Sequence, residues 1–462
     1  MALPDGPKSP HIWQKLLWIG TPFALMRECR QRYGESFVLA IGQKIPQVVF
    51  VSSPEALELI LANDDDDIFD APGELNAAVL PLLGAESVIG LSGERHRRAR
   101  QLLMPPLHGE RMRSYGQLIQ EITADVMSEQ RIGKAFSVRS VAQRISLRVI
   151  LQAVFGLRQG PRYQRLEMLL STMLDRMSNP FSASFLFLPK LQLDFGPQSP
   201  WGRFIRSRQQ IDELLYAEIS DRRSQMPGDD ILSLLLGARD ETGAPLSDLE
   251  LRDELMTLLV AGHETTATAI TWALYWIHKL PAVREKLINE LQSLGDPADP
   301  NAIFRLPYLT AVCSETIRIY PVGILTFPRI TKRSVELDGV TLEPGTPVIG
   351  SIYLAHRREQ VYPDPESFRP ERFLERRYSP YEFLPFGGGS RRCIGMAFAQ
   401  FEMKLVVARV LSGFELALAD NRTVRLVRRG ITSGPSPFQV VVKRRLDGVG
   451  ARLSSDYATA GG

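Results

Sequence analysis

A single cysteine stands where the surrounding residues favour metal chemistry. Cys393 closes the glycine-rich stretch 385–393 and is followed by an apolar helical pattern. Unpaired N–H groups at the start of a helix, together with the basic Arg391 and Arg392, favour a thiolate over a thiol. Clustered glycines let the backbone approach a flat cofactor, and Phe386 can shield the sulfur from water. The pattern predicts a soft thiolate ligand to iron, which favours cleavage of an O–O bond.

Two other kinds of site do not fit this stretch. A serine hydrolase needs Gly-x-Ser-x-Gly, but Arg392 occupies the position two residues after Ser390. A zinc or iron–sulfur site needs several clustered thiols or imidazoles, and Cys393 has neither close in sequence. A buried inert cysteine beside a glycine turn is the structural alternative.

A second group of polar residues interrupts an apolar helical pattern over 249–279. Glycine in mid-helix costs about 1 kcal/mol relative to alanine, and an acid in an apolar helix is also unfavourable. Such local conflicts indicate a functional site. Gly262 would leave room for dioxygen, Thr265 would donate a hydrogen bond to it, and Glu264 would relay protons from solvent. A harmless polar kink is the alternative.

Both patterns resemble the signatures of one family, the cytochromes P450. The cysteine stretch is similar to the complete haem-binding signature through Phe386, Gly389, Arg391, Cys393 and Gly395. The interrupted helix is similar to the signature Ala/Gly-Gly-x-Asp/Glu-Thr through Ala261, Gly262, Glu264 and Thr265. The resemblance implies haem b (iron protoporphyrin IX), held between this helix and the helix after the cysteine. It also implies a monooxygenase that activates O2 and inserts one oxygen atom into an apolar substrate.

The resemblance also assigns residues to the haem propionates. His96 and Arg100 lie on one helical face at i, i+4, and Arg329 follows Pro328. Solvated basic side chains are the alternative for all three. With these, the residues expected to bind the cofactor are Cys393, Arg391, His96, Arg100, Arg329, Phe386, Gly395 and Ala261.

Three further arginines, Arg95, Arg97 and Arg98, point elsewhere on the His96 helix. They are expected to form a basic proximal face on which an acidic electron donor could dock.

A buried ion-pair network is implied behind the haem. Glu315 and Arg318 lie on one helical face at i, i+3, and Arg372 follows downstream after an aromatic and proline-rich connection. By resemblance these three residues form the family's three-way salt bridge. Since a buried charge left unpaired is strongly destabilising, they are interpreted as structural.

The substrate is expected to be lipophilic, because segments that line the pocket in the family are apolar here. The expected pocket residues are Val79, Leu80, Leu83, Val322, Ile324 and Leu325. The aromatic run within 181–188 is expected to form an access lid or core, with a weak membrane contact as the alternative. Hydroxylation or epoxidation of a fatty acid or terpenoid fits best.

No nucleotide-binding motif is found, so electrons are expected from a partner, a ferredoxin or a flavodoxin with its reductase. A non-catalytic haem-thiolate protein that binds a ligand or senses a gas is the alternative function. It predicts no need for Thr265.

The rest of the chain supplies the elements that position these residues. Apolar residues recur at helical spacing around 111–129, 141–155, 162–177, 202–223, 249–279, 282–293, 308–319 and 394–412. Short β-branched or alternating runs at 37–41, 47–52, 347–349 and 438–442 predict a few strands near the two ends. The expected fold is mainly α with small β-sheets (α+β), a single cytochrome P450 domain over 1–448, followed by a disordered tail over 449–462.

Composition narrows the setting. The 462 residues carry a formal net charge of +3, too balanced to suggest nucleic acid as a partner. Three separated cysteines favour a reducing compartment, and no transmembrane anchor or secretion signal is apparent, so a cytoplasmic monomer is expected. The acidic run Asp64 to Asp67 is interpreted as a solvated loop.

Overall fold

A computed structural model of the chain describes residues 3–446, apart from 43–46, 65–66, 110, 157–159, 179–191, 227, 296–298 and 430–431. The α-helices are α1 (His11–Gly20), α2 (Pro22–Tyr33), α3 (Pro54–Ala62), α4 (Leu80–Leu83), α5 (Gly93–Leu103), α6 (Arg111–Ser128), α7 (Val138–Phe155), α8 (Pro161–Ser178), α10 (Pro200–Arg223), α11 (Ile231–Gly237), α12 (Asp248–Lys279), α13 (Pro281–Gln292), α14 (Pro300–Arg305), α15 (Pro307–Ile319), α16 (Ile352–Ala355), α17 (Arg372–Glu375) and α18 (Met396–Gly413). Short 3₁₀ turns are η1 (Gly73–Val79), η2 (Pro105–Leu107) and η4 (Gly389–Arg391).

The strands are β1 (Ser36–Leu39), β2 (Val48–Val51), β3 (Phe69–Asp70), β4 (Ala135–Ser137), β5 (Arg329–Thr331), β6 (Val335–Leu337), β7 (Val340–Leu342), β8 (Pro347–Gly350), β9 (Phe414–Leu418), β10 (Leu426–Arg429), β11 (Thr432–Pro435) and β12 (Gln439–Arg445).

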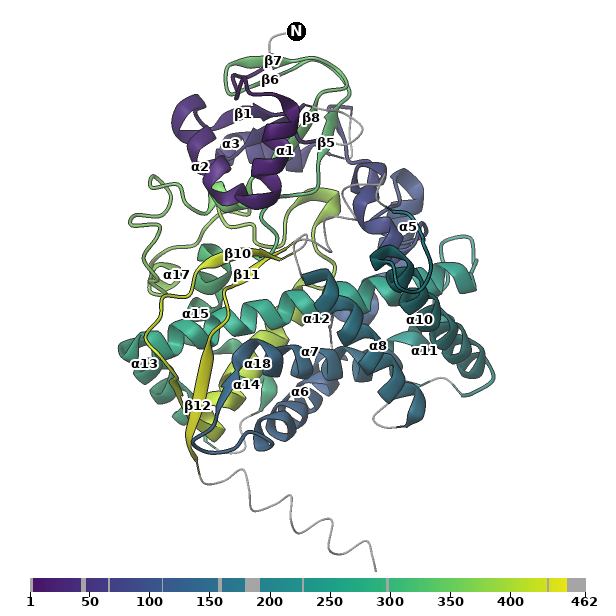
Figure 1. The fold of residues 1–462 in the computed structure, drawn as a ribbon, viewed down its shortest axis with the longest axis vertical. Coiled ribbons are helices and arrows are strands. Elements are labelled where there is room, and N and C mark those ends of the chain that lie inside the picture. The colour runs from purple at the N-terminus through teal and green to yellow at the C-terminus, as the bar shows by residue number, and fades with distance from the viewer. Residues whose placement is uncertain are drawn as a thin grey trace, which may run out of the picture.

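The longest helix, α12, passes through the middle of the helical body (Figure 1). It starts at a capping box, in which the Ser247 hydroxyl accepts the Glu250 N–H and the Glu250 carboxylate accepts the Ser247 N–H. Because α7, α18, α15 and α10 all pack on it, most of its length is buried on more than one side. This central position lets its middle residues face a cavity enclosed by other helices.

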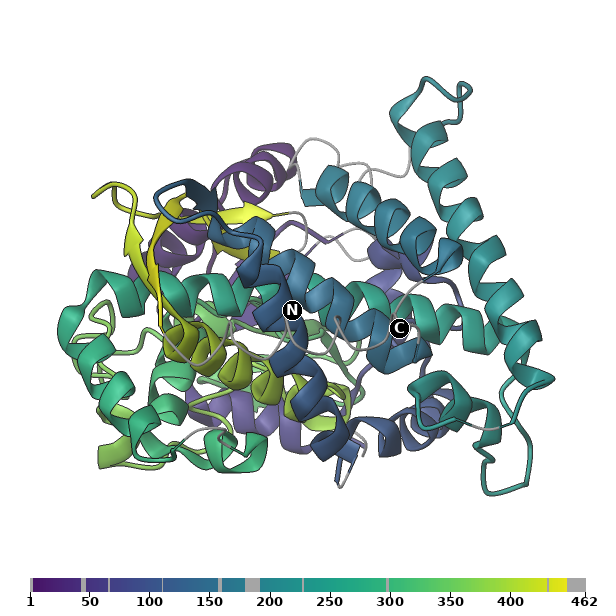
Figure 2. The same cartoon turned by 90° about the horizontal axis from the view of Figure 1, so that it is seen from below.

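A five-stranded sheet joins distant parts of the chain. Its strand order is β1-β2-β8-β5-β3, with β2 parallel to β8 and the other pairs antiparallel. Helices α1 and α2 lie beside it at one end of the molecule (Figure 1). A second sheet has the strand order β4-β12-β9, and its strands from the end of the chain, β9 and β12, appear in yellow in the view turned by 90° (Figure 2).

The predicted fold class is confirmed: the chain is mainly helical, has small sheets and forms a single domain. The helices expected from periodicity appear within a few residues of their predicted ends. The sequence interpretation missed α1, α2 and the β10–β11 hairpin, all of them short elements. The predicted lid over 181–188 and the tail over 449–462 lie outside the described residues.

Among the helices of the described part of the chain, none is both long and apolar enough to cross a membrane.

Candidate functional site

The cysteine loop is shaped by glycines that other residues could not replace. Gly387 and Gly389 adopt left-handed φ angles of +67° and +66°. A Cβ on Gly389 would come within 2.6 Å of the Leu61 carbonyl oxygen at the end of α3. The Cys393 N–H then donates to the Phe386 carbonyl at 3.0 Å, which closes the loop just before α18 begins.

A buried acid anchors this loop from the other end of the chain. Asp64 accepts from the Ser390 N–H at 3.0 Å and from the Ser390 hydroxyl at 3.0 Å. It also accepts from two nitrogens of Arg329, at 2.5 and 2.9 Å, while Arg329 donates to the Gly388 carbonyl at 3.0 Å. Asp64 and Arg329 are both buried.

These contacts bear on two expectations. Asp64 is not part of a solvated loop, although Asp67 in the same acidic run is exposed. Arg329 pairs with Asp64 and is not among the residues that line the cavity described below, so its contact with a propionate stays a prediction. The physical reason is burial: a guanidinium enclosed this deeply needs a carboxylate partner, and Asp64 supplies it.

The sulfur of Cys393 faces an internal cavity. Its side chain is accessible from that space although protein surrounds it. Burial raises the pKa of the Cys393 thiol, while the Gly395 N–H and the charges of Arg100 and Arg392 lower it. The local groups therefore lower the pKa of the thiol, as the sequence predicted, but burial raises it by more. A bound metal ion would be needed to make the thiolate the dominant form.

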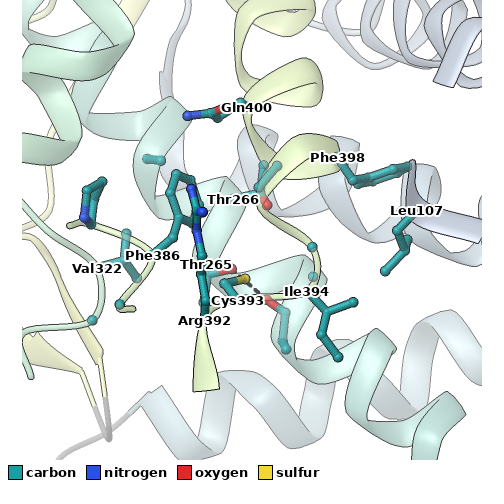
Figure 3. Close-up of a pocket in the computed structure, with 18 of the residues that line it drawn as sticks. Leu107, Thr265, Thr266, Val322, Phe386, Arg392, Cys393, Ile394, Phe398 and Gln400 are labelled. Carbon is teal, nitrogen blue, oxygen red and sulfur yellow. Dashed lines mark hydrogen bonds between the residues drawn. The ribbon is translucent and has the colours of Figure 1, made fainter. Parts of the chain in front are cut away.

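The cavity has a volume of about 440 Å³, within the range of small-molecule sites. Cys393 and Phe386 line it from the cysteine loop, and Ala261, Gly262 and Thr265 line it from α12. In the close-up, the Cys393 sulfur and the Phe386 and Thr265 side chains border the same space (Figure 3). The two motifs, more than a hundred residues apart, thus meet as opposite walls of one site.

The two central residues of α12 are held in defined ways. The Thr265 hydroxyl donates to the Ala261 carbonyl at 2.5 Å, one turn earlier. A Cβ on Gly262 would lie 3.1 Å from the Ile150 side chain of α7. Gly262 therefore also permits close packing of α12 against α7, a role that the sequence interpretation did not consider.

Glu264 does not line the cavity. It pairs with Arg139 of α7 at 2.5 Å and accepts from the Gln143 amide at 2.9 Å, with little solvent exposure. A proton relay from Glu264 to Thr265 therefore requires the Glu264 carboxylate to break its ion pair with Arg139.

A basic cluster borders the cavity beside the cysteine loop. His96 and Arg100, one turn apart on α5, line it together with Arg391. Burial, together with Arg391 and Arg100, lowers the pKa of His96 to about 3, and burial with Arg329 lowers that of Arg391 to about 10. Arg391 also donates to the carbonyls of Ala71, Val88 and Leu91. So much positive potential in one place suits an anionic group.

Taken with the apolar walls and the cysteine sulfur, this cluster fits haem. Two propionates would relieve the repulsion between Arg100 and Arg391 and could accept a hydrogen bond from neutral His96, and the flat macrocycle would occupy the space between the two motifs. Phe386 and Gly395 lie beside Cys393 on the same wall.

The other arginines of α5 correct a further expectation. Arg95 pairs with Glu86, Arg97 with Glu94, and Arg98 with both Asp240 and Glu250. Their charges are balanced by neighbouring carboxylates, so they do not form a basic face for an acidic partner.

The ion-pair network lies where the resemblance implied. Glu315 accepts from Arg318 at 2.6 and 2.8 Å and from Arg372 at 3.2 Å, and all three side chains are buried. Arg318 also donates to the His356 carbonyl, and Arg372 to the Pro363 carbonyl. The network ties α15 to the segment that leads into the cysteine loop.

Expected pocket residues are only partly found at the cavity. Val322 and Leu325 line it, whereas Val79, Leu80, Leu83 and Ile324 do not. Leu83 and Ile324 are buried in the hydrophobic core, because their side chains point away from the cavity into packed clusters. Apolar sequence alone does not show which side of a segment faces a cavity.

One buried acid near the site gave no sequence signal. Glu402 of α18 is fully buried, and neither of its carboxylate oxygens has a hydrogen bond of normal geometry to the described residues. Burial raises its pKa from 4.5 to about 8, and the Ser146 hydroxyl of α7 offsets part of the rise. Ser146 lies far from Glu402 in the sequence, so only the folded chain brings the two together.

This acid should make stability depend on pH. Between about pH 4.5 and pH 8 folded Glu402 keeps a proton that the unfolded chain releases, so the free energy of unfolding falls as pH rises through this window. Glu402→Gln removes the effect, and the variant should be more stable than the parent at pH 8 by on the order of a few kcal/mol. Urea denaturation at pH 5 and pH 8 measures how steeply the free energy of unfolding changes with pH in the parent and in Glu402→Gln. The exposed Glu359→Gln is the control, and equal slopes in Glu402→Gln and the parent would contradict this account.

Comparisons with known proteins agree with the geometry. A sequence model of the family described as Cytochrome P450 matches residues 4–442. A Mycobacterium tuberculosis protein named as cytochrome P450 135B1 is 36% identical over 422 residues, covering 90% of this chain and 86% of the relative. Another from the same organism, named as cytochrome P450 138, is 31% identical over 452 residues, covering 96% and 97%. A solved structure, retinoic acid bound cyanobacterial CYP120A1, matches with a TM-score of 0.81 and 25% identity, covering 96% of this chain and all of that one.

Proposed function

Because this chain belongs to the cytochrome P450 family, we propose that it binds haem b through Cys393 and uses O2 to hydroxylate or epoxidise a lipophilic molecule. The observation that carries the proposal is the meeting of Cys393 with Gly262 and Thr265 across one cavity. A reduced protein supplied with an electron donor and O2 should form product without added hydrogen peroxide. Product formation that requires added peroxide would count against the proposal.

The bound haem supplies the oxygen activation, and the chain supplies its surroundings. Cys393 would hold the iron through its sulfur, with Phe386 beside it on the cavity wall and the Gly395 N–H supporting the thiolate form. His96, Arg100 and Arg391 orient the macrocycle by binding its propionates. Ala261 and Gly262 leave space on the opposite wall.

Thr265 and Glu264 handle protons. In the structure the Thr265 hydroxyl donates to Ala261, and turning it toward the cavity would let it donate to oxygen there. Glu264 does not line the cavity and pairs with Arg139 of α7. Release of that ion pair lets the carboxyl carry a proton inward, and its return to Arg139 closes the route.

Thr265→Ala is expected to uncouple the reaction. Electron consumption should continue, while product per electron falls about tenfold or more and hydrogen peroxide accumulates, because a positioned proton donor contributes 10²–10⁴-fold to such steps. The matched control is Thr268→Ala on the same helix, whose hydroxyl does not line the cavity. Unchanged coupling in Thr265→Ala would favour the non-catalytic alternative, a ligand-binding or gas-sensing haem protein.

Apolar walls support a fatty acid or terpenoid as substrate. Leu103, Leu258 and Phe327 join Val322 and Leu325 around the cavity. The solved structure of CYP120A1 holds retinoic acid, a long lipophilic molecule of the terpenoid class. A screen of such compounds by the shift of the haem absorption band identifies ligands that displace iron-bound water.

Electrons are proposed to come from a ferredoxin or flavodoxin with its reductase, in the cytoplasm. Arg392, exposed beside Cys393, offers a positive charge on the cysteine side.

A further inference from the structure

Helix α1 lies on the molecule with Gln14 and Trp18 turned inward. Its one buried residue is Gln14. The Gln14 amide donates to the carbonyls of Pro7 and Ser9, both at 2.9 Å, and its carbonyl accepts from the Ala40 N–H at 2.8 Å. The bond with Ala40 ties the helix to the residue after β1, and the two bonds with Pro7 and Ser9 hold the segment that leads into the helix, so Gln14 faces inward.

The outward face of α1 is apolar. The exposed side chains are Ile12 (62%), Trp13 (59%), Leu16 (51%) and Leu17 (45%). Their spacing, i, i+1, i+4 and i+5, places them on one side of the helix, opposite Gln14. A helix on the surface of a soluble protein normally has the reverse arrangement, and an apolar patch of this kind marks an interaction site.

The charges around the patch select the kind of partner. No acidic residue occurs between Gly6 and Arg27, a stretch that contains Lys8, His11 and Lys15. Lys8 and His11 are exposed and Lys15 is half-exposed. Tryptophan and leucine on one face, with lysines at the border and no acid, are the pattern of a helix that lies in the interface of an anionic bilayer.

We propose that α1 docks the protein on an anionic lipid membrane, with Trp13 and Leu16 inserted at the headgroup level. The helix remains parallel to the bilayer surface, held by Gln14. This is a peripheral contact through one short helix.

The position of α1 relates this contact to the cavity. Trp18, on the inner side of α1, packs in the same hydrophobic cluster as Leu325, which lines the cavity. Arg428 of β10 donates to the Trp18 carbonyl at 2.5 Å, and Ser433 of β11 donates its N–H to the Val322 carbonyl of the cavity wall. The inner side of α1 and part of the cavity wall therefore belong to one packed cluster. Delivery of a lipophilic substrate by this route rests on the proposed function, whereas the membrane contact does not.

The test is sedimentation of the haem-loaded full chain with large vesicles. One set contains phosphatidylcholine alone, and the other an equal mixture of phosphatidylcholine and phosphatidylglycerol. The protein should sediment with the mixed vesicles, more weakly at high salt, and less with phosphatidylcholine alone. The double variant Trp13→Ser/Leu16→Ser should bind the mixed vesicles at least about tenfold more weakly, because it removes two large apolar side chains from the patch that would enter the bilayer interface.

The matched control is Leu374→Ser on α17, which removes a leucine that is 51% exposed on another part of the surface. It should bind vesicles like the parent. Lys8→Glu/Lys15→Glu should lose binding to the mixed vesicles selectively. The carbon monoxide difference spectrum of each variant should match the parent, which separates failure of the membrane contact from failure of the proposed function.

Three outcomes would overturn the proposal. The first is absence of sedimentation with either vesicle, and the second is equal binding of the parent and Trp13→Ser/Leu16→Ser. The third is a concentration-dependent dimer in solution that the double variant abolishes, since the patch would then be a contact between two copies of this chain.

Discussion

Glu315→Ala is expected to yield little folded protein that carries haem. Glu315 is fully buried and accepts hydrogen bonds from two guanidinium groups, those of Arg318 and Arg372, and from the Arg369 N–H at 2.9 Å. Its removal leaves two cationic side chains enclosed without a carboxylate. Breaking a buried pair in this way costs about 3–5 kcal/mol. Since whole domains are stable by only about 5–15 kcal/mol, the loss should be decisive.

The measurements are the midpoint of urea denaturation and the ratio of haem to protein after purification. An exposed pair in the same region, Arg369 with Glu375, provides the control. Glu375→Ala should change stability by less than about 1 kcal/mol, because solvent screens such pairs. Purification of Glu315→Ala with full haem content and parental stability would show that the network is not needed for the fold.

Cys393→Ala should abolish the spectral signature of the enzyme. The reduced protein in carbon monoxide should lose the strongly red-shifted Soret band that an anionic sulfur ligand produces. Product formation should fall more than about a thousandfold, which corresponds to a loss of ~4 kcal/mol of transition-state stabilisation. Haem should still bind, because His96, Arg100 and Arg391 remain to hold its propionates, but it should bind more weakly than in the parent.

Two other cysteines test the specificity of this result. Cys29 is buried in the cluster beside α2, and Cys313 lies on α15. Cys29→Ala should keep the displaced absorbance, although the lost side chain lowers stability somewhat. A Cys393→Ala protein that retains the absorbance would mean that another residue ligates the iron, with Cys313, which also borders the cavity, as the next to replace.

The parts of the site that the sequence predicted are those whose signals are local. Cys393 with its glycines, and Gly262 with Thr265, are recognisable within short windows because the turn or the helix itself demands unusual residues. Periodicity likewise located the long helices, since the apolar stripe of a helix repeats within a few residues.

What the sequence did not show depends on pairing across the chain. Nothing near Asp64 indicates that Arg329, or Ser390 much further on, will meet it. In the same way, an acid such as Glu402 looks like any charged position in a helix until its neighbours are placed around it. The orientation of α1, with Gln14 facing inward and its apolar side chains outward, also depends on a distant residue, because Gln14 accepts a hydrogen bond from Ala40.

The bond between Asp64 and Ser390 has a consequence for the order of assembly. It spans a sequence separation of 326 residues, so the loop that carries Cys393 cannot reach its final position until both segments exist and have met. Contacts of such long range form slowly, after local helices. Newly made protein should therefore pass through a helical state that cannot retain its cofactor, and haem capture should coincide with the last step of maturation.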